Sequence, residues 1–242
     1  MPKEPKLPDP VRLLVELQRG GEIHQEVEGK TLDPHIALLR AWQTERLAGT
    51  YADLLASKRY NPACRFFLDD LYAPRDFSQR DHDVKRFHTF ISRFVPEAML
   101  GILTDSIKLN ELTHALDEAL VRALVDKLGV TDMITPELYA EGYRICDNYV
   151  ERARQIELII KIGRQVDEAV RLPLVWTTLK LARGPAKRAG WIELQSFLER
   201  GYTAFKHMHG AEGFLRTVEG RETKILDQIF GGKAEPFEVG LN

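Results

Sequence analysis

The sequence predicts an all-α protein: a multi-helix bundle of about eight helices around a long antiparallel helix pair, residues 97–128 and 136–172. Apolar residues recur through both segments at steps of three and four, the spacing of one face of an α-helix. No stretch alternates between apolar and polar residues for long, and no Asn-Gly or Asp-Gly turn separates β-branched runs. Together these observations predict helices packed on helices, without a sheet.

Residues 97–128 are the helix around which we expect the rest of the chain to be arranged. The segment has no internal proline and covers about nine helical turns. Near its end, between residues 120 and 125, apolar side chains point in nearly all directions. We therefore expect neighbours on several sides and an innermost position. Its apolar positions include Met99, Ile102, Leu103, Ile107, Leu112, Leu116, Leu120 and Leu124.

Before this helix the chain divides into shorter pieces. Residues 1–30 are expected to be a partly disordered tail with a short helix, because four of the first ten residues are proline. Asp33 before a proline predicts an N-cap and a helix that ends near Ser57. A short helix over 62–72 and another over 79–95 follow, separated by Ala73-Pro74.

After the central helix the second long helix begins at a Thr-Pro pair and has acidic residues in its first turns. Prolines and glycines then separate three further apolar-periodic segments, 174–181, 191–209 and 214–229. We predict one helical domain over residues 31–232 and a flexible tail over 233–242.

Composition excludes several classes of protein. The formal charge of −2 argues against nucleic-acid binding, which usually needs a basic excess. No apolar run is long enough to span a membrane, and the first residues do not resemble a signal peptide, so we expect a cytoplasmic protein. Cys64 and Cys146 fall inside apolar helical patterns, which favours two buried thiols over a disulfide.

The densest mixture of charged and aromatic residues lies between residues 65 and 81, around the turn at Pro74. Two interpretations stay open for this segment, which we name the 65–81 knuckle. Its charges cap and pair two helices, or they form a polar docking site for a partner or an anion. The candidate binding residues are Arg65, Asp69, Asp70, Tyr72, Arg75, Asp76, Arg80 and Asp81.

Two motifs resemble a known family. The run FFLDDLYAPRDFSQRD at residues 66–81 and the run LQSFLERGYTAFKHM at residues 194–208 resemble a family of bacterial all-helical proteins without an established activity. The resemblance covers about residues 37–230. It implies a helical fold and a bacterial origin, and it identifies no catalytic residue.

Metal binding has only weak candidates, Glu111 and His114. A Glu-x-x-His pair is half of the di-metal signature of four-helix bundles, which needs a second such pair and two further glutamates. The second long helix has Glu151 followed at the same spacing by Arg154, which is not a metal ligand. We therefore predict no metal.

The sequence leaves three classes of function open. The first is an interaction or regulatory protein that docks a protein partner, or a second copy of itself as a homodimer, through the 65–81 knuckle. The second is a small-ligand protein that holds haem or a lipid between the long helices. The third, least favoured, is a di-metal carboxylate enzyme. No nucleophile, phosphate-loop or zinc motif is present, so an enzyme is not the first expectation and no cofactor is predicted, with haem or a metal left open.

Overall fold

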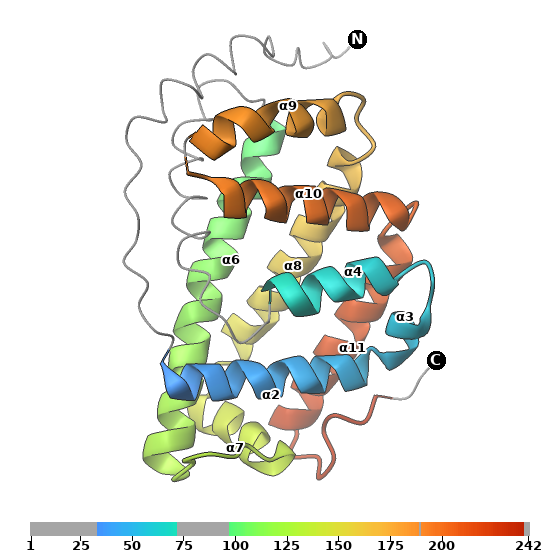
Figure 1. The fold of residues 1–242 in the computed structure, drawn as a ribbon. Coiled ribbons are helices and arrows are strands. Elements are labelled where there is room, and N and C mark those ends of the chain that lie inside the picture. The colour runs from blue at the N-terminus through green and yellow to red at the C-terminus, as the bar shows by residue number, and fades with distance from the viewer. Residues whose placement is uncertain (1–32, 72–96, 189, 240–242) are drawn as a thin grey trace.

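The computed structural model describes residues 33–71, 97–188 and 190–239, and every regular element in these ranges is a helix. The predicted all-α fold is confirmed (Figure 1). No helix in the described residues is both long and apolar enough to cross a membrane.

Two layers of helices cross each other steeply (Figure 1). One layer holds the long helices α6 (Glu97–Arg122), α8 (Tyr149–Ala169) and α11 (Glu212–Phe230), with α7 (Pro136–Cys146) at one end. The other layer holds α9 (Val175–Arg188), α10 (Ile192–His207), α4 (Asn61–Phe66) and α2 (Pro34–Thr50), one below another across the long helices. The remaining elements are α3 (Ala52–Ala56) and two π-helical turns, η2 (Phe67–Leu71) and η3 (Ala123–Lys127).

The predicted antiparallel pair is present as α6 and α8. Gln155 donates a hydrogen bond to the Thr113 hydroxyl at 2.8 Å, and the Lys161 ammonium lies 2.7 Å from an Asp105 carboxylate oxygen. Residue numbers thus rise along α8 as they fall along α6, which is what an antiparallel packing requires.

Two details of this pair differ from the prediction. The expected helix over 136–172 is two helices, α7 and α8, because Asp147 adopts a left-handed conformation with φ of 47° and ends α7. The central position is shared, since α8 packs against both α6 and α11, while α6 packs against α8, α2 and α7. The segment 97–128 is buried mainly towards its end, at Leu116, Leu120, Ala123 and Leu124.

Some helix ends lie where the capping residues predict them, and others do not. Asp33 caps α2 as predicted, accepting from the backbone N–H of His35 at 2.8 Å. The predicted break near residues 184–185 is wrong, because α9 continues to Arg188. The predicted segments 1–30 and 79–95 lie outside the described residues.

Of the tail predicted over residues 233–242, the structure describes residues 233–239. In this stretch the chain folds back on the bundle. The Phe237 ring lies 5.5 Å from Trp42 and 5.9 Å from Tyr139 between ring centroids, and Gln228 donates to the Pro236 carbonyl at 2.7 Å. The end of the described chain therefore contributes to the core.

The core consists of two clusters, one at each end of the crossing layers. The first joins α4, α8, α10 and α11, and the second joins α2, α6, α7 and α11. Representative members of the first are Ala63, Ile160, Phe205, Met208 and Leu215, and of the second Leu39, Leu120, Tyr139, Leu226 and Ile229.

Gly163 is a point of close helix approach, as expected, but the helix that approaches it is α11 and not α6. A Cβ atom at Gly163 would lie 2.5 Å from Cδ2 of Leu215, a side chain that is 1% exposed. The glycine therefore allows α8 and α11 to pack at their observed distance.

We predict that Gly163→Ala destabilises the protein. The new methyl group overlaps a buried leucine, which costs about 1–3 kcal/mol, more than the ~1 kcal/mol that alanine gains over glycine in a helix. The matched control is Gly220→Ala on α11, where nothing lies within 4 Å of the added atom and a small gain in stability is expected. Urea unfolding of both variants measures this, and equal stability of the two would contradict the packing described.

Candidate functional site

A cavity lies between the two helix layers of the described structure. Its volume is about 290 Å³, and its walls come from α2, α4, η2, α6, α8 and α10. The part near α10 is apolar, while the part near α2 and the middle of α6 carries hydroxyl, amide and charged groups. The apolar lining includes Phe66, Ile102, Ile162, Val166, Phe197 and Leu198, and the polar lining includes Arg40, Gln43, Asn110, Thr113, His114 and Asp117.

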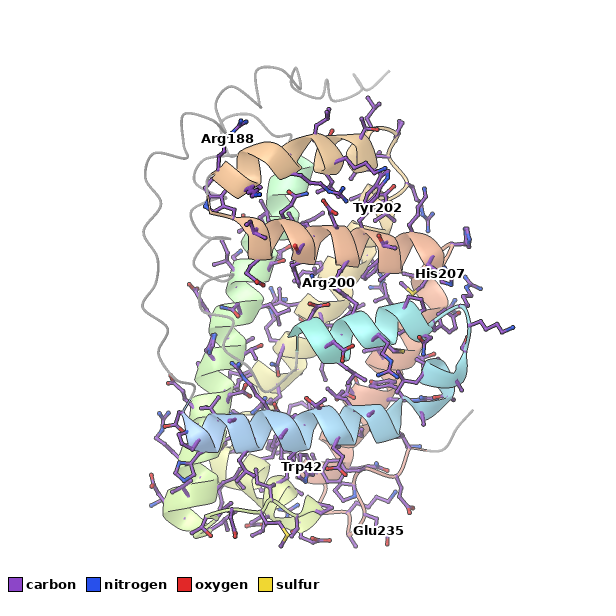
Figure 2. All side chains as sticks on the ribbon, viewed as in Figure 1. Trp42, Arg188, Arg200, Tyr202, His207 and Glu235 are labelled. Atoms are coloured by element: carbon purple, nitrogen blue, oxygen red, sulfur yellow. The ribbon has the colours of Figure 1, made fainter. Side chains whose placement is uncertain are left out.

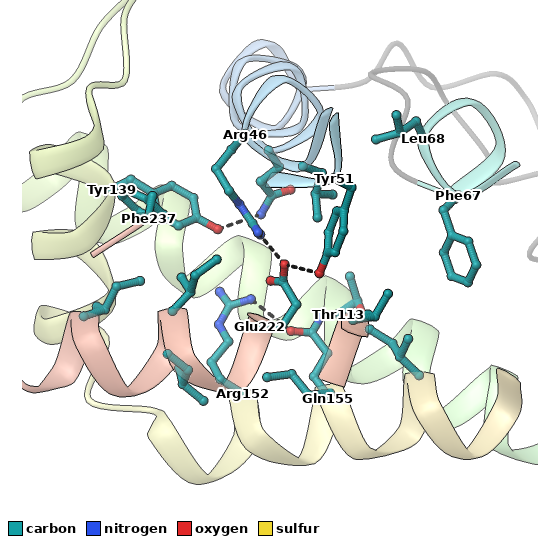
Figure 3. Close-up of a pocket in the computed structure, with 18 of the residues that line it drawn as sticks. Arg46, Tyr51, Phe67, Leu68, Thr113, Tyr139, Arg152, Gln155, Glu222 and Phe237 are labelled. Atoms are coloured by element: carbon teal, nitrogen blue, oxygen red, sulfur yellow. Dashed lines mark hydrogen bonds and ion pairs between the residues drawn. The ribbon is translucent and has the colours of Figure 1, made fainter. Parts of the chain in front are cut away.

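Figure 3 shows a second, smaller cavity of about 110 Å³. This cavity shares part of its wall with the first. The shared residues are Gln43, Phe67, Thr113, Asp117 and Ile159. We name the two spaces the apolar chamber and the polar chamber. The polar chamber is bounded by α2, α6, α7, α8 and α11, and buried charged groups project into it.

One charge pair in the polar chamber is complete. The Arg46 guanidinium lies 2.6 Å from a Glu222 carboxylate oxygen, and Tyr51 donates to the same oxygen at 2.8 Å (Figure 3). The side chains of Arg46 and Glu222 are only 13% and 18% exposed, so each charge is neutralised where water has little access.

A second buried cation, Arg152 of α8, has a different set of partners. Its guanidinium donates to the Gln155 side-chain oxygen at 3.2 Å and to the Leu116 carbonyl at 3.1 Å, and it lies 4.3 Å from the centre of the Tyr143 ring. Its Nε has no hydrogen-bond partner, and the residue is 4% exposed. Among the described residues no carboxylate lies within ion-pair distance of it.

Asp117 of α6 stands in the wall that the two chambers share. It is 4% exposed, and Gln43 donates to one of its oxygens at 3.3 Å. Burial raises the pKa of Asp117 above its ordinary value, because removal from water disfavours the charged form more than Arg152 and Gln43 favour it. Asp117 is therefore shifted towards a neutral carboxyl, which can donate as well as accept a hydrogen bond.

Of the candidate residues in the 65–81 knuckle, the structure describes Arg65, Asp69 and Asp70. Arg65 and Asp69 are exposed and form no ion pair with each other, because the change to π-helical geometry at Phe67 shifts the expected four-residue register. Asp70 is 5% exposed and pairs with Arg200 of α10, which reaches from α10 towards α4 (Figure 2). Tyr72, Arg75, Asp76, Arg80 and Asp81 lie outside the described residues.

The weak metal candidates Glu111 and His114 are both exposed on α6. Within the described ranges no group of three or more His, Cys, Asp or Glu side chains could hold a metal ion. Cys64 and Cys146 are free thiols. Burial raises the pKa of Cys64 to about 11, so this thiol is not an activated nucleophile.

Comparison with known proteins identifies the family of this chain. The model of a family described as a domain of unknown function (DUF8198) matches residues 22–236. The chain belongs to this family. No curated protein and no solved structure matches it. The DUF8198 match agrees with the resemblance seen in the sequence. It extends further at both ends, from residue 22 before α2 to Pro236 after α11.

Sequence reasoning missed the charged residues of the polar chamber. Asp117 and Arg152 each interrupt a run of apolar residues at helical spacing: Asp117 lies one residue after Leu116 and three before Leu120. A charge on an apolar helix face is the signal that could have identified them, because such a group must find a partner when the face is buried.

We predict that Asp70→Asn lowers stability by about 1–3 kcal/mol, because Arg200 makes three charge-assisted contacts to the Asp70 carboxylate at 2.6–3.0 Å. Asp126→Asn in η3 is the control, since Asp126 is exposed and its replacement should change stability by less than about 1 kcal/mol. Denaturant unfolding of the two variants measures the difference. An equal or larger loss at Asp126 would show that the Asp70 carboxylate does not stabilise the fold through Arg200.

We also predict that Asp117→Asn raises the melting temperature at neutral pH. With a pKa higher in the folded than in the unfolded chain, the folded state binds more protons between the two values, so stability falls as pH rises through that window. The Asp117→Asn variant does not lose this stability as pH rises. The difference in melting temperature between the variant and the natural chain should therefore be smallest below the ordinary aspartate pKa and grow with pH. Melting temperatures measured across the acid to neutral range test this, and a pH-independent difference would contradict it.

Proposed function

We propose that this protein binds a small amphipathic molecule, lipid-like in its apolar part, in the chamber between the two helix layers. The observation that carries the proposal is the cavity of about 290 Å³ whose lining changes from apolar at α10 to polar at α2. Pockets for small molecules in proteins have this character: mostly apolar walls with a few polar groups that fix orientation.

The cavity walls support binding along the length of the chamber. Aromatic rings from α4 and α10 face the long helices at one end, where the Phe66 and Phe197 ring centroids are 5.1 Å apart. At the other end the Thr113 hydroxyl and the Asp117 carboxyl come from α6. An apolar body with one polar end matches this order of groups, because each part then meets surroundings of its own polarity.

Docking of a protein partner at the 65–81 knuckle stays a separate prediction from the sequence. Two described members, Arg65 and Asp69, are exposed on the surface of α4 and η2. A second copy of this chain is the other partner expected there. The cytoplasm of a bacterial cell is the proposed setting, and it rests on the sequence alone.

We predict that Ile107→Trp blocks ligand uptake. Ile107 lines the apolar chamber, and an indole there fills space that a ligand needs. The matched control is Ile145→Trp on α7, at a residue that is 40% exposed and lines neither chamber. Nile red, a neutral dye that fluoresces in apolar surroundings, measures the uptake. We expect at least about a tenfold loss of dye affinity in the first variant and no change in the second.

Native mass spectrometry and solvent extraction of the freshly purified protein complete the test, because a bound natural ligand would be released. An empty protein that also takes up no dye would overturn the proposal. A Soret band in the absorbance spectrum that disappears in His114→Ala would identify haem instead of a lipid-like ligand, since His114 lines the chamber.

A further inference from the structure

We propose that the ligand is an acid, and that its carboxylate binds to Arg152 in the polar chamber while its hydrocarbon part fills the apolar chamber. This inference rests on the proposed function and specifies the chemical class of the ligand.

The charge balance of the polar chamber supports an anionic partner. Arg46 is neutralised by Glu222 at 2.6 Å, whereas within the described part of the chain Arg152 contacts the neutral oxygens of Gln155 and Leu116 and the face of Tyr143. A buried cation without an anion is costly, and its free energy falls when a carboxylate reaches it. The unpartnered Nε of Arg152 is a donor available to that carboxylate.

The neighbouring carboxyl does not supply the missing charge. Asp117 is the nearest candidate, but it forms no ion pair with Arg152, and burial favours its neutral form. In its protonated form, which burial favours, Asp117 can instead donate a hydrogen bond to an incoming carboxylate. The site thus combines a fixed cation with a carboxyl group that donates when protonated, and the cation is complementary to an acid and not to an amine.

A path of polar contacts connects the cation with the apolar chamber. Arg152 donates to Gln155 at 3.2 Å, and Gln155 donates to Thr113 at 2.8 Å (Figure 3). Thr113 and Asp117 line both chambers, so the wall between them is polar at the place where a head group would pass. A molecule with its acid at Arg152 would have its chain directed past this wall towards Ile159 and Phe67, which line both chambers as well.

The test compares three ligands of equal chain length on the full protein: dodecanoic acid, dodecanol and methyl dodecanoate. Displacement of Nile red gives the affinity of each. We expect the acid to bind at least about tenfold more tightly than the ester, because only the acid forms a charge-assisted bond to a guanidinium. This comparison needs no variant, so it decides the proposal even if a change at Arg152 prevents folding.

Variants then locate the head group. Arg152→Gln should remove the preference for the acid and leave the affinity for dodecanol unchanged. Arg154→Gln is the control on the same helix, because Arg154 is exposed and pairs with Glu157 on the surface. If Arg40→Gln removes the preference and Arg152→Gln does not, the acid binds at the Arg40 end of the apolar chamber and the assignment to Arg152 is wrong.

The outcomes separate the two proposals. Failure of all three ligands to bind would overturn the proposed function itself. Equal affinity for acid, alcohol and ester would leave ligand binding intact and overturn the assignment of an acid.

Discussion

α8 is packed from two sides, and the position of every group in the two chambers depends on that packing. On one side α6 holds it through Arg152 to Leu116, Gln155 to Thr113 and Lys161 to Asp105. On the other side α11 comes so close that only a glycine fits opposite Leu215. The polar contacts fix how far α8 slides along α6, and the glycine fixes its separation from α11. Because the position of α8 relative to both α6 and α11 is fixed, the position and direction of the Arg152 side chain in the bundle are fixed as well.

The space between the layers follows from how the helices cross. Helices that cross at steep angles touch at limited points and diverge on either side, so large side chains must fill the gaps. Here aromatic residues of α4 and α10 fill them at one point, where a Cβ on Gly201 would be 3.0 Å from the Phe66 ring. The apolar chamber lies behind this contact, between α4, η2 and α10 on one side and the long helices α6 and α8 on the other, and it extends to Arg40 and Gln43 of α2. The cavity is thus a consequence of the crossing of the two layers. Its apolar end lies at α10 and its polar end at α2.

The sequence predicted what local chemistry determines. The Asp33 cap, the all-α class and the antiparallel pairing of α6 with α8 follow from spacing and capping residues near each helix. The break at Asp147 was missed because aspartate tolerates left-handed backbone without requiring it. The chambers could not be predicted, because they depend on contacts between residues such as Arg46 and Glu222 that lie far apart in the chain. The pairing of Asp70 with Arg200 could not be predicted for the same reason, because local charge density does not tell which distant residue Asp70 meets.

Buried charges in a bundle of this size need a reason to be there. Apolar residues of similar volume at Asp117 and Arg152 would pack without desolvation cost, and such replacements often stabilise proteins. The two groups form no direct ion pair, and burial shifts Asp117 towards its neutral form, so Asp117 does not offset the cost of burying the Arg152 charge. A polar cluster that is incomplete in the free protein is stabilised when a ligand supplies the missing charge, and the binding free energy then includes the recovery of that cost. Under the proposal of an acidic ligand, the cost of burying Arg152 without an anion is the source of the selectivity for a ligand with an acidic end.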